Sequence, residues 1–338
     1  MNKWICSLGE DALIDAIARR HSAPHRRLIK GMGDDASVTV QHGGRALLAT
    51  TDILIEGVHF KKGSTTPYLL GRKSLSVSLS DIAAMGGSPA FHLVSLAMPP
   101  RTPKAFVDGL YEGISGCAGE FGSCLAGGNT ARLPERIMIS TTVFGEMPMD
   151  EVVYRSGARP GDVIYVTGAL GASALGLLAL KTGRARAMSG PYKDAVLKHL
   201  DPAPRLAAGR TLARKRLATA MMDISDGLGI DLKRLCEASR VGAEVEIDRI
   251  PVPESLMRHA SRQGVSAASF AVAGGEDYEL LFTASARNAA AIERVSAGLG
   301  LGMTAIGRIV AKGKAHAPVF MDGRGARVKM ERLGFEHF

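Results

Sequence analysis

The stretch that most constrains the fold is a short apolar run that leads into two hydroxyls and a carboxylate. Residues 46–49 are apolar, lie just after Gly43, Gly44 and Arg45, and continue into Thr50, Thr51 and Asp52. Such a run is typical of a buried strand, and in α/β proteins ligands bind outside the carboxyl ends of strands. Hydroxyl and carboxylate oxygens suit Mg²⁺. The triplet is therefore either an ordinary polar turn or part of a magnesium site.

Four further acidic spots support the magnesium interpretation. Most lie beside glycine or hydroxyl residues and at predicted element ends: Asp34 with Asp35, Asp81, Asp223 with Ser225 and Asp226, and Glu276 with Asp277. Together in one pocket, these carboxylates would carry more negative charge than is stable without divalent cations. An acidic, metal-filled pocket in a basic chain suits polyphosphate chemistry.

Hydrophobic periodicity predicts a first domain in which helices and strands alternate. Helices are expected over residues 7–20, 68–85 and 103–121, and strands over residues 37–40, 91–98, 124–126 and 137–144. Pro67 suits an early helical position, after Thr65 and Thr66 as possible caps. The alternation favours an α/β domain. We predict a boundary at the turn near residue 147, which divides the chain into domains 1–147 and 148–338.

The second half repeats the pattern of strands followed by helices. Strands are expected over residues 163–166, 218–222 and 278–283, and helices over residues 172–180, 204–215 and 228–239. Asp223 then lies at a strand-to-helix junction, where anions and their metals are held. Asp81 lies in the last turns of its helix, where a bound cation would offset the unfavourable helix dipole.

Composition limits the partners and the compartment. The chain has 338 residues and a formal net charge of +9, but its basic clusters are short and no basic stripe alternates with aromatics. Phosphorylated small molecules are therefore favoured over nucleic acid. The four cysteines lack metal-binding spacing, and neither a signal peptide nor a membrane span is predicted. We expect a cytoplasmic protein with reduced thiols.

The common nucleotide-binding signatures are missing from the sequence. No P-loop, protein-kinase catalytic loop, nucleophile elbow or dinucleotide-binding glycine motif occurs. If a nucleotide binds, magnesium ions held by aspartates and an arginine must carry its phosphates. The residues by themselves therefore indicate metal-dependent handling of a phosphorylated ligand.

Taken in order, the motifs resemble those of the thiamine-monophosphate kinases, in the aminoimidazole ribonucleotide synthetase superfamily. The matching strings are GDDA at 33–36, TTD at 50–52, GVHF at 57–60, SDIAAMG at 80–86, RSGA at 155–158, DISDGL at 223–228, GGEDYEL at 274–280 and GFEHF at 334–338. The resemblance runs from about residue 7 to the end of the chain. The HF pair, the GGEDYEL string and the tail are specific to this kinase.

This resemblance implies ATP-dependent phosphorylation of thiamine monophosphate to thiamine diphosphate by direct in-line transfer with several Mg²⁺ ions. It also implies a mixed α/β, two-domain synthetase-like fold and a homodimer in which the N-terminal sheets pair. A non-catalytic sensor of nucleotide or thiamine phosphate stays open, as does a related enzyme such as a cyclo-ligase.

The resemblance also implies residue roles. The metal ligands would be Asp35, Thr50, Thr51, Asp52, Asp81, Asn129, Asp223 and Asp226, with Asp52, Asp81 and Asp223 as the catalytic residues. Contacts to ATP would come from Gly128, Asn129, Arg155 and Ser225, and contacts to thiamine monophosphate from His59, Glu276 and Phe335. Structural roles stay open for three of these: core packing or capping for His59, an ion pair for Arg155, and terminal packing for Phe335.

One departure from the family pattern generates a prediction. The family commonly has GGDT where this chain has Gly127-Gly128-Asn129-Thr130. A neutral amide oxygen is a weaker Mg²⁺ ligand than a carboxylate. We therefore expect Asn129→Asp to leave the Mg²⁺ concentration required for half-maximal activity unchanged or lower. A Mg²⁺ titration of both proteins checks this, and a large increase in the requirement would contradict it.

Overall fold

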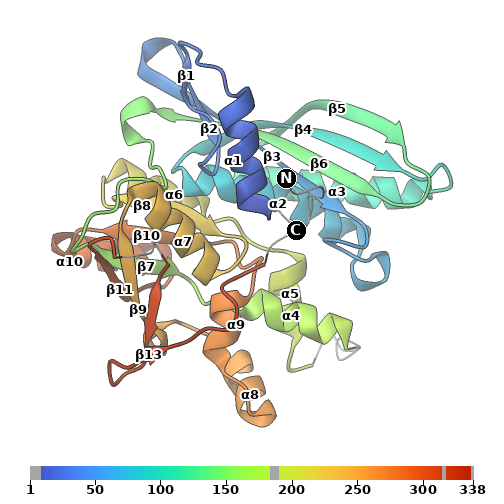
Figure 1. Cartoon of the computed structure of the whole chain (residues 1–338). Coiled ribbons are helices and arrows are strands. Elements are labelled where there is room, and N and C mark those ends of the chain that lie inside the picture. The colour runs from blue at the N-terminus through green and yellow to red at the C-terminus, as the bar shows by residue number, and fades with distance from the viewer. Residues whose placement is uncertain (1–8, 183–189, 314–316, 336–338) are drawn as a thin grey trace.

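The protein contains two mixed sheets with helices between and around them (Figure 1). The computed structural model describes residues 9–182, 190–313 and 317–335. The start of the first predicted helix, Cys6 and tail residues 336–338 lie outside the described residues. Within the described ranges, no helix combines the length and the apolar character that a bilayer-spanning segment requires.

The first sheet has six strands in the order β1-β2-β3-β6-β4-β5. Their bounds are β1 (Leu28–Lys30), β2 (Ser37–Val40), β3 (Arg45–Ile55), β4 (Ser88–Met98), β5 (Cys124–Arg132) and β6 (Met138–Pro148). Neighbours in this sheet run antiparallel, except that β5 runs parallel to β4. β5 is therefore an edge strand that reaches the sheet by the crossover through α3 (Lys104–Phe121).

The second sheet has seven strands in the order β13-β12-β9-β11-β7-β10-β8. Their bounds are β7 (Val163–Thr167), β8 (Ala220–Ile224), β9 (Gly242–Glu246), β10 (Glu279–Ala284), β11 (Met303–Val310), β12 (Val319–Met321) and β13 (Arg327–Val328). β8 and β10 run antiparallel, with Asp223 opposite Leu280. The carboxyl end of β8 therefore lies beside the amino end of β10.

The helices flank these sheets. Besides α3, they are α1 (Glu10–His21), α2 (Pro67–Ala84), α4 (Ala172–Lys181), α5 (Lys193–Leu200), α6 (Leu206–Arg214), α7 (Leu228–Ser239), α8 (Glu254–Gln263), α9 (Ala267–Ala273) and α10 (Ala289–Leu299). The start of α2 was predicted correctly: Pro67 is its first residue, and the Thr66 hydroxyl accepts a hydrogen bond from the Leu69 N–H at 3.2 Å.

The mixed α/β fold class is confirmed, and most strand pairs are antiparallel. Two local expectations were wrong. β3 continues to Ile55, which puts Thr50 to Asp52 inside the strand instead of at its end. β5 extends to Arg132, so Gly128 and Asn129 lie within a strand and not in a turn.

Helix α2 lies at the centre of the molecule. It packs against β3, β6 and α3 of the first half, and against α6, β8 and β10 of the second half. One continuous apolar core therefore includes Leu48 and Leu79 on one side and Leu212 and Phe282 on the other. The domain division after residue 147 stays a prediction; β6 ends beside it, at Pro148.

Two glycines let α2 and α3 approach each other closely. A Cβ added to Gly113 would lie 1.9 Å from the Tyr68 carbonyl oxygen, and one added to Gly71 would lie 2.0 Å from the Leu110 carbonyl oxygen. No side chain can be accommodated at either position without moving a helix, because both contacts are with backbone atoms. This contact sets the distance of α2 from α3.

We predict that Gly113→Ala lowers the free energy of unfolding by about 1–3 kcal/mol, because the added methyl group forces the helices apart. Gly119→Ala on the same helix is the matched control, since a Cβ at Gly119 meets nothing within 4 Å. That change should be neutral or stabilising by up to about 1 kcal/mol. Urea titration measures both, and equal effects would contradict the packing role of Gly113.

Candidate metal and phosphate site

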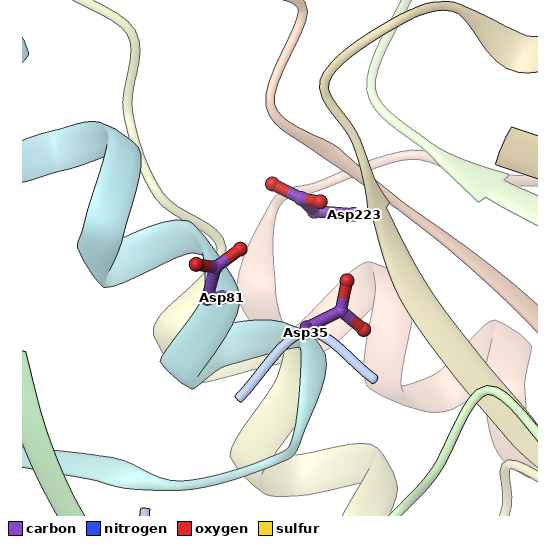
Figure 2. A group of neighbouring side chains, drawn as sticks. All are labelled: Asp35, Asp81 and Asp223. Atoms are coloured by element: carbon purple, nitrogen blue, oxygen red, sulfur yellow. The ribbon is translucent and has the colours of Figure 1, made fainter. Parts of the chain in front are cut away.

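Three carboxylates from distant parts of the chain meet between the two sheets. Asp35 precedes β2, Asp81 lies in the last turns of α2, and Asp223 lies in β8. Each offers an oxygen, and these oxygens all lie within 4.8 Å of one another. Figure 2 shows the three carboxyl groups turned toward one another. The Asp35–Asp81–Asp223 group has the geometry of a divalent cation site.

Burial and mutual repulsion make this group unfavourable without a cation. Burial, followed by repulsion from neighbouring aspartates, raises the pKa of Asp81 well above its usual value. Burial and then Asp35 raise the pKa of Asp223 in the same way. The Oδ2 atom of Asp35 is buried without a hydrogen-bond partner among the described residues. A hard cation would satisfy this oxygen and neutralise the cluster.

Hydroxyl groups hold the carboxylates in position. The Ser80 hydroxyl donates to Asp223 at 2.6 Å, and the Thr50 hydroxyl donates to Asp81. A fourth carboxylate, that of Asp52, accepts from the Ser78 hydroxyl at 2.7 Å. Burial raises the pKa of Asp52, and its charge in turn raises the pKa of Asp81. Asp52 therefore belongs to the same electrostatic group.

The alternation of β3 separates the Thr50-Thr51-Asp52 triplet. Thr50 and Asp52 face α2, whereas Thr51 points to the opposite, outer face of the sheet. There the Thr51 hydroxyl accepts from the Thr142 hydroxyl at 3.0 Å and lies 3.4 Å from the Ser140 hydroxyl. The triplet does not act as one unit, because consecutive strand residues face opposite sides.

Gly128 and Asn129 lie away from the carboxylate group. Both are on edge strand β5, which two strands separate from β3, a distance of about 14 Å at ordinary strand spacing. Asn129 is exposed and pairs with Ser95. A Cβ at Gly128 would lie 1.9 Å from the Val94 carbonyl oxygen, which is a packing reason for this glycine. Within the described chain, neither residue joins the cluster.

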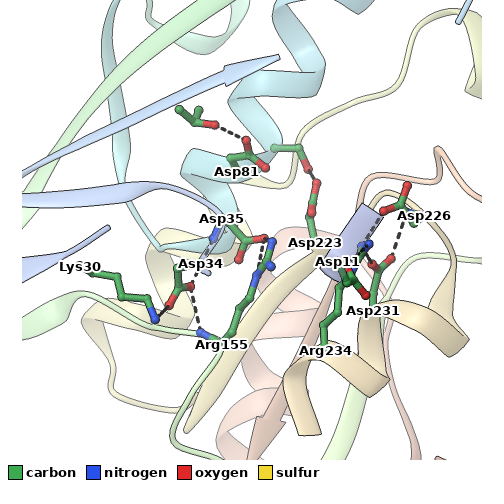
Figure 3. Close-up of polar contacts among 12 residues, drawn as sticks. Asp11, Lys30, Asp34, Asp35, Asp81, Arg155, Asp223, Asp226, Asp231 and Arg234 are labelled. Carbon is green, nitrogen blue, oxygen red and sulfur yellow. Dashed lines mark hydrogen bonds and ion pairs between the residues drawn. The ribbon is translucent and has the colours of Figure 1, made fainter. Parts of the chain in front are cut away.

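Arg155 and Lys30 balance part of the negative charge. The Arg155 guanidinium forms an ion pair with the Asp35 carboxylate at 2.7 Å. The backbone N–H of Arg155 donates a hydrogen bond to the Asp34 carboxylate at 3.1 Å. Lys30 lies 3.5 Å from Asp34 (Figure 3). The ion-pair alternative for Arg155 is therefore observed, and it puts the guanidinium at the edge of the carboxylate group.

Asp226 takes part in a different cluster, centred on Arg234. The Arg234 guanidinium contacts Asp226 at 2.5 Å, Asp231 at 3.2 Å and Asp11 of α1 at 3.0 Å (Figure 3). The Asp231 carboxylate also accepts from the Asp226 and Gly227 N–H groups, which fixes the turn before α7. In this structure, Asp226 is therefore held by an arginine and lies outside the carboxylate group.

Two of the three residues expected to contact substrate, His59 and Phe335, lie at the end of β3 and in the tail. The His59 Nδ1 accepts from the Ile55 N–H at 3.0 Å, which fixes the imidazole beside the end of β3. Phe335 is 52% exposed, and its N–H donates a hydrogen bond to the Asp226 carbonyl oxygen at 2.9 Å. The tail therefore passes beside the turn that carries Asp226.

Glu276 lies in a strained turn beside the carboxylate group. Glu276 and Tyr278 have φ angles of 64° and 49°, in the left-handed region that residues other than glycine rarely adopt. The Glu276 N–H donates to the Ser225 carbonyl oxygen at 2.6 Å, and the Tyr278 N–H donates to the Ile224 carbonyl oxygen at 2.9 Å. The turn is thus held to the end of β8, directly after Asp223.

Sequence reasoning missed three polar residues on α2. Lys73, Ser78 and Ser80 are buried and contact Glu276, Asp52 and Asp223 respectively. The signal that indicates them is the alternation of serines in residues 74–80 of a helix without a polar face. Polar residues on a helix that is buried all round need partners, and here the partners are the acidic residues of the site.

Both halves of the chain resemble domains of known proteins. Residues 33–147 match the AIR synthase related protein, N-terminal domain, and residues 159–319 match the corresponding C-terminal domain. Thiamine-monophosphate kinase of Bacillus subtilis is 34% identical over 98% of this chain and 100% of its own length. The kinase of Aquifex aeolicus is 36% identical over 98% of both chains.

A solved structure supports the same relationship. AaThiL complexed with AMPPCP and TMP superimposes with a TM-score of 0.86 at 32% identity, and the match covers 100% of both chains. The similarity therefore extends over the whole length of both proteins and is not limited to one domain.

We predict that Asp81→Asn stabilises the metal-free protein at pH 7.5, raising its melting temperature by several degrees, because a neutral amide removes repulsion from the cluster. The folded-state pKa of Asp81 is raised, so the wild type gains stability as the pH falls through that value toward the unfolded one. The advantage of the variant should therefore shrink at pH 5.

Thermal unfolding with and without Mg²⁺ measures these effects. Mg²⁺ should raise the melting temperature of the wild type more than that of Asp81→Asn, because the variant has lost one ligand. Asp108→Asn is the control, since Asp108 forms an exposed pair with Lys104 on α3. Equal Mg²⁺ responses in wild type and Asp81→Asn would contradict a cation site at this position.

Proposed function

This chain belongs to the AIR synthase related protein family and, within it, to the thiamine-monophosphate kinases, and we propose that it phosphorylates thiamine monophosphate with ATP to give thiamine diphosphate. Full-length similarity to curated kinases of this name supports the proposal. The structural observation that carries it is the Asp35–Asp81–Asp223 group, because three converging carboxylates suit a polyphosphate–magnesium complex.

Magnesium is the ion that fits these residues best. The donors are carboxylate and hydroxyl oxygens, and the buried Oδ2 atom of Asp35 has no hydrogen-bond partner among the described residues. We propose that Asp35, Asp81 and Asp223, with Asp52 and Thr50 beside them, hold Mg²⁺. When bound, Mg²⁺ neutralises phosphate charge as the phosphoryl group transfers. Thr51, Asn129 and Asp226, implied by the family resemblance, remain proposed ligands of further ions outside this group.

The chain's own residues would then orient both substrates. The Arg155 guanidinium, beside Asp35, is suited to a phosphate of ATP, with Ser225, Gly128 and Asn129 as further proposed ATP contacts. We propose that thiamine monophosphate contacts His59, Glu276 and Phe335. The acceptor is already a phosphate oxygen, so positioning and charge stabilisation carry the reaction and no dedicated general base is needed.

We also propose that two copies of the chain pair through their first sheets. The outer face of that sheet exposes large apolar side chains: Ile53, Phe91 and Leu93 are 36–43% exposed. Such a patch is typical of an interface between copies. A cytoplasmic location fits the free thiols of Cys117, Cys124 and Cys236, and the partners are small phosphorylated molecules, not nucleic acid.

Incubation of the protein with ATP, Mg²⁺ and thiamine monophosphate tests the function, with thiamine diphosphate as the expected product. We predict that Asp52→Ala lowers kcat by at least about 100-fold while far-UV circular dichroism stays that of the wild type, because the variant loses a carboxylate of the charge-stabilising group. Chromatographic quantification of thiamine diphosphate measures the loss.

Asp150→Ala is the matched control. Asp150 is an exposed aspartate that pairs with Arg216 away from the cluster, so its loss should leave kcat unchanged. Near-normal turnover by Asp52→Ala would remove Asp52 from the catalytic group. Tight binding of both substrates by the wild type without product would instead identify a non-catalytic sensor and overturn the kinase proposal.

A further inference from the structure

A buried lysine faces the candidate site from α2. The Lys73 side chain is only 3% exposed, and its ammonium group forms an ion pair with the Glu276 carboxylate at 2.8 Å. Lysine is almost never buried unless it is paired, because the charged group loses its hydration. The phosphoryl-transfer chemistry assigns no role to this residue, so its burial requires a separate explanation.

Both oxygens of the Glu276 carboxylate are contacted by side chains, one by Lys73 and the other by His199. The ammonium group contacts Oε1 of Glu276, and the Nδ1 atom of His199 lies 3.1 Å from Oε2 and 3.0 Å from the Ser173 hydroxyl. Burial alone would raise the pKa of Glu276, but Lys73 and His199 outweigh it and hold the pKa below its usual range. Glu276 is therefore an ionised carboxylate in a fixed orientation.

The fixed carboxylate still has acceptor capacity for a ligand. An ionised carboxylate offers about four lone-pair positions, and the contacts described occupy one on each oxygen. The Glu276 side chain is 25% exposed, so it is not sealed within the protein. The remaining lone pairs can accept N–H donors, which gives the position a chemical preference for an amino-substituted ligand.

The surroundings of Glu276 connect it to the acidic cluster. Tyr278, two residues further on, is buried and has its pKa raised by burial and then by the charges of Glu276, Asp52 and Asp223. The strained backbone of this turn persists because β8 holds it in place. Strain of this kind is concentrated at ligand-binding positions, where it presents a side chain in a particular direction.

Helix α2 links this position to the phosphate site. Lys73 precedes Asp81 by eight residues, which corresponds to about 12 Å along the helix axis. Helix α2 therefore supports the Glu276 carboxylate through Lys73 and contributes Asp81 to the Asp35–Asp81–Asp223 group. This arrangement suits a ligand whose amino group and phosphate lie at opposite ends, as they do in thiamine monophosphate.

We propose that Lys73 is a positioning residue for the phosphate acceptor: its ion pair with Glu276 orients the carboxylate so that it accepts hydrogen bonds from the aminopyrimidine N–H groups of thiamine monophosphate. The inference rests on the proposed kinase function and adds a residue that acts through Glu276. It contributes to acceptor binding and specificity and has no part in the transfer of the phosphoryl group.

The test compares Lys73→Met, Glu276→Gln and the double variant in steady-state kinetics. Lys73→Met should raise the KM for thiamine monophosphate by about tenfold or more, while the KM for ATP changes by less than about twofold. The double variant should be no worse than Glu276→Gln alone, because Lys73 acts through that carboxylate. The double variant also leaves no unpaired buried charge, so the proposal can still be tested with it if Lys73→Met fails to fold.

Arg72→Met is the matched control. Arg72 is the neighbouring cation on α2 and pairs with Asp201 and Glu120 instead of Glu276. Its loss removes ion pairs from the same helix but should leave the KM for thiamine monophosphate unchanged. An equal rise in this KM for Arg72→Met and Lys73→Met would show a general structural effect and overturn the proposal.

Two further outcomes separate this inference from the kinase proposal. Additive losses in the double variant, or an unchanged acceptor KM in Lys73→Met, would refute the role of Lys73 while leaving the kinase intact. If the wild type forms no thiamine diphosphate, the kinase proposal fails, and titration calorimetry with thiamine monophosphate still tests Lys73. Binding weakened about tenfold or more in Lys73→Met supports the inference. Affinity equal to that of the wild type, or no binding of thiamine monophosphate by the wild type itself, overturns it.

Discussion

Repulsion among buried carboxylates is the constraint that the rest of the structure accommodates. Asp35, Asp81 and Asp223 offer oxygens within 4.8 Å of one another in surroundings that disfavour charge. Such a group persists only if the elements that carry it are held together by other interactions. Hydroxyl donors and the Arg155 guanidinium reduce the repulsion, and the packing of two sheets around α2 supplies the remaining stability.

Helix α2 makes this arrangement possible because it is buried on nearly all sides. Its apolar side chains join the cores of both halves, so the helix cannot shift without disturbing either sheet. Ser78 faces Asp52 of the first sheet, and Ser80 faces Asp223 of the second. The same helix carries Asp81 and Lys73, so the phosphate-binding and acceptor-binding sides of the proposed site share one rigid support.

Sequence reasoning was accurate where a signal is local. The amino end of α2 was correct because Thr66 and Pro67 form a capping pattern that depends on neighbouring residues only. It was inaccurate where the signal depends on strand pairing. Thr51 was grouped with Thr50 and Asp52, but a continuous strand turns consecutive residues to opposite faces. The length of β3 is set by its pairing with β6, which no short stretch of sequence reveals.

The sequence by itself determined that the protein carries several acidic spots with hydroxyl neighbours, and its motif order determined the family resemblance. Composition and spacing are enough for this, because carboxylates and hydroxyls indicate hard cations wherever they gather. Only the tertiary structure decided which of them gather: Asp35, Asp81 and Asp223 do, whereas Asp226 pairs with Arg234. The physical reason is that metal geometry depends on side-chain direction and on contacts between residues far apart in the chain, and packing alone sets both.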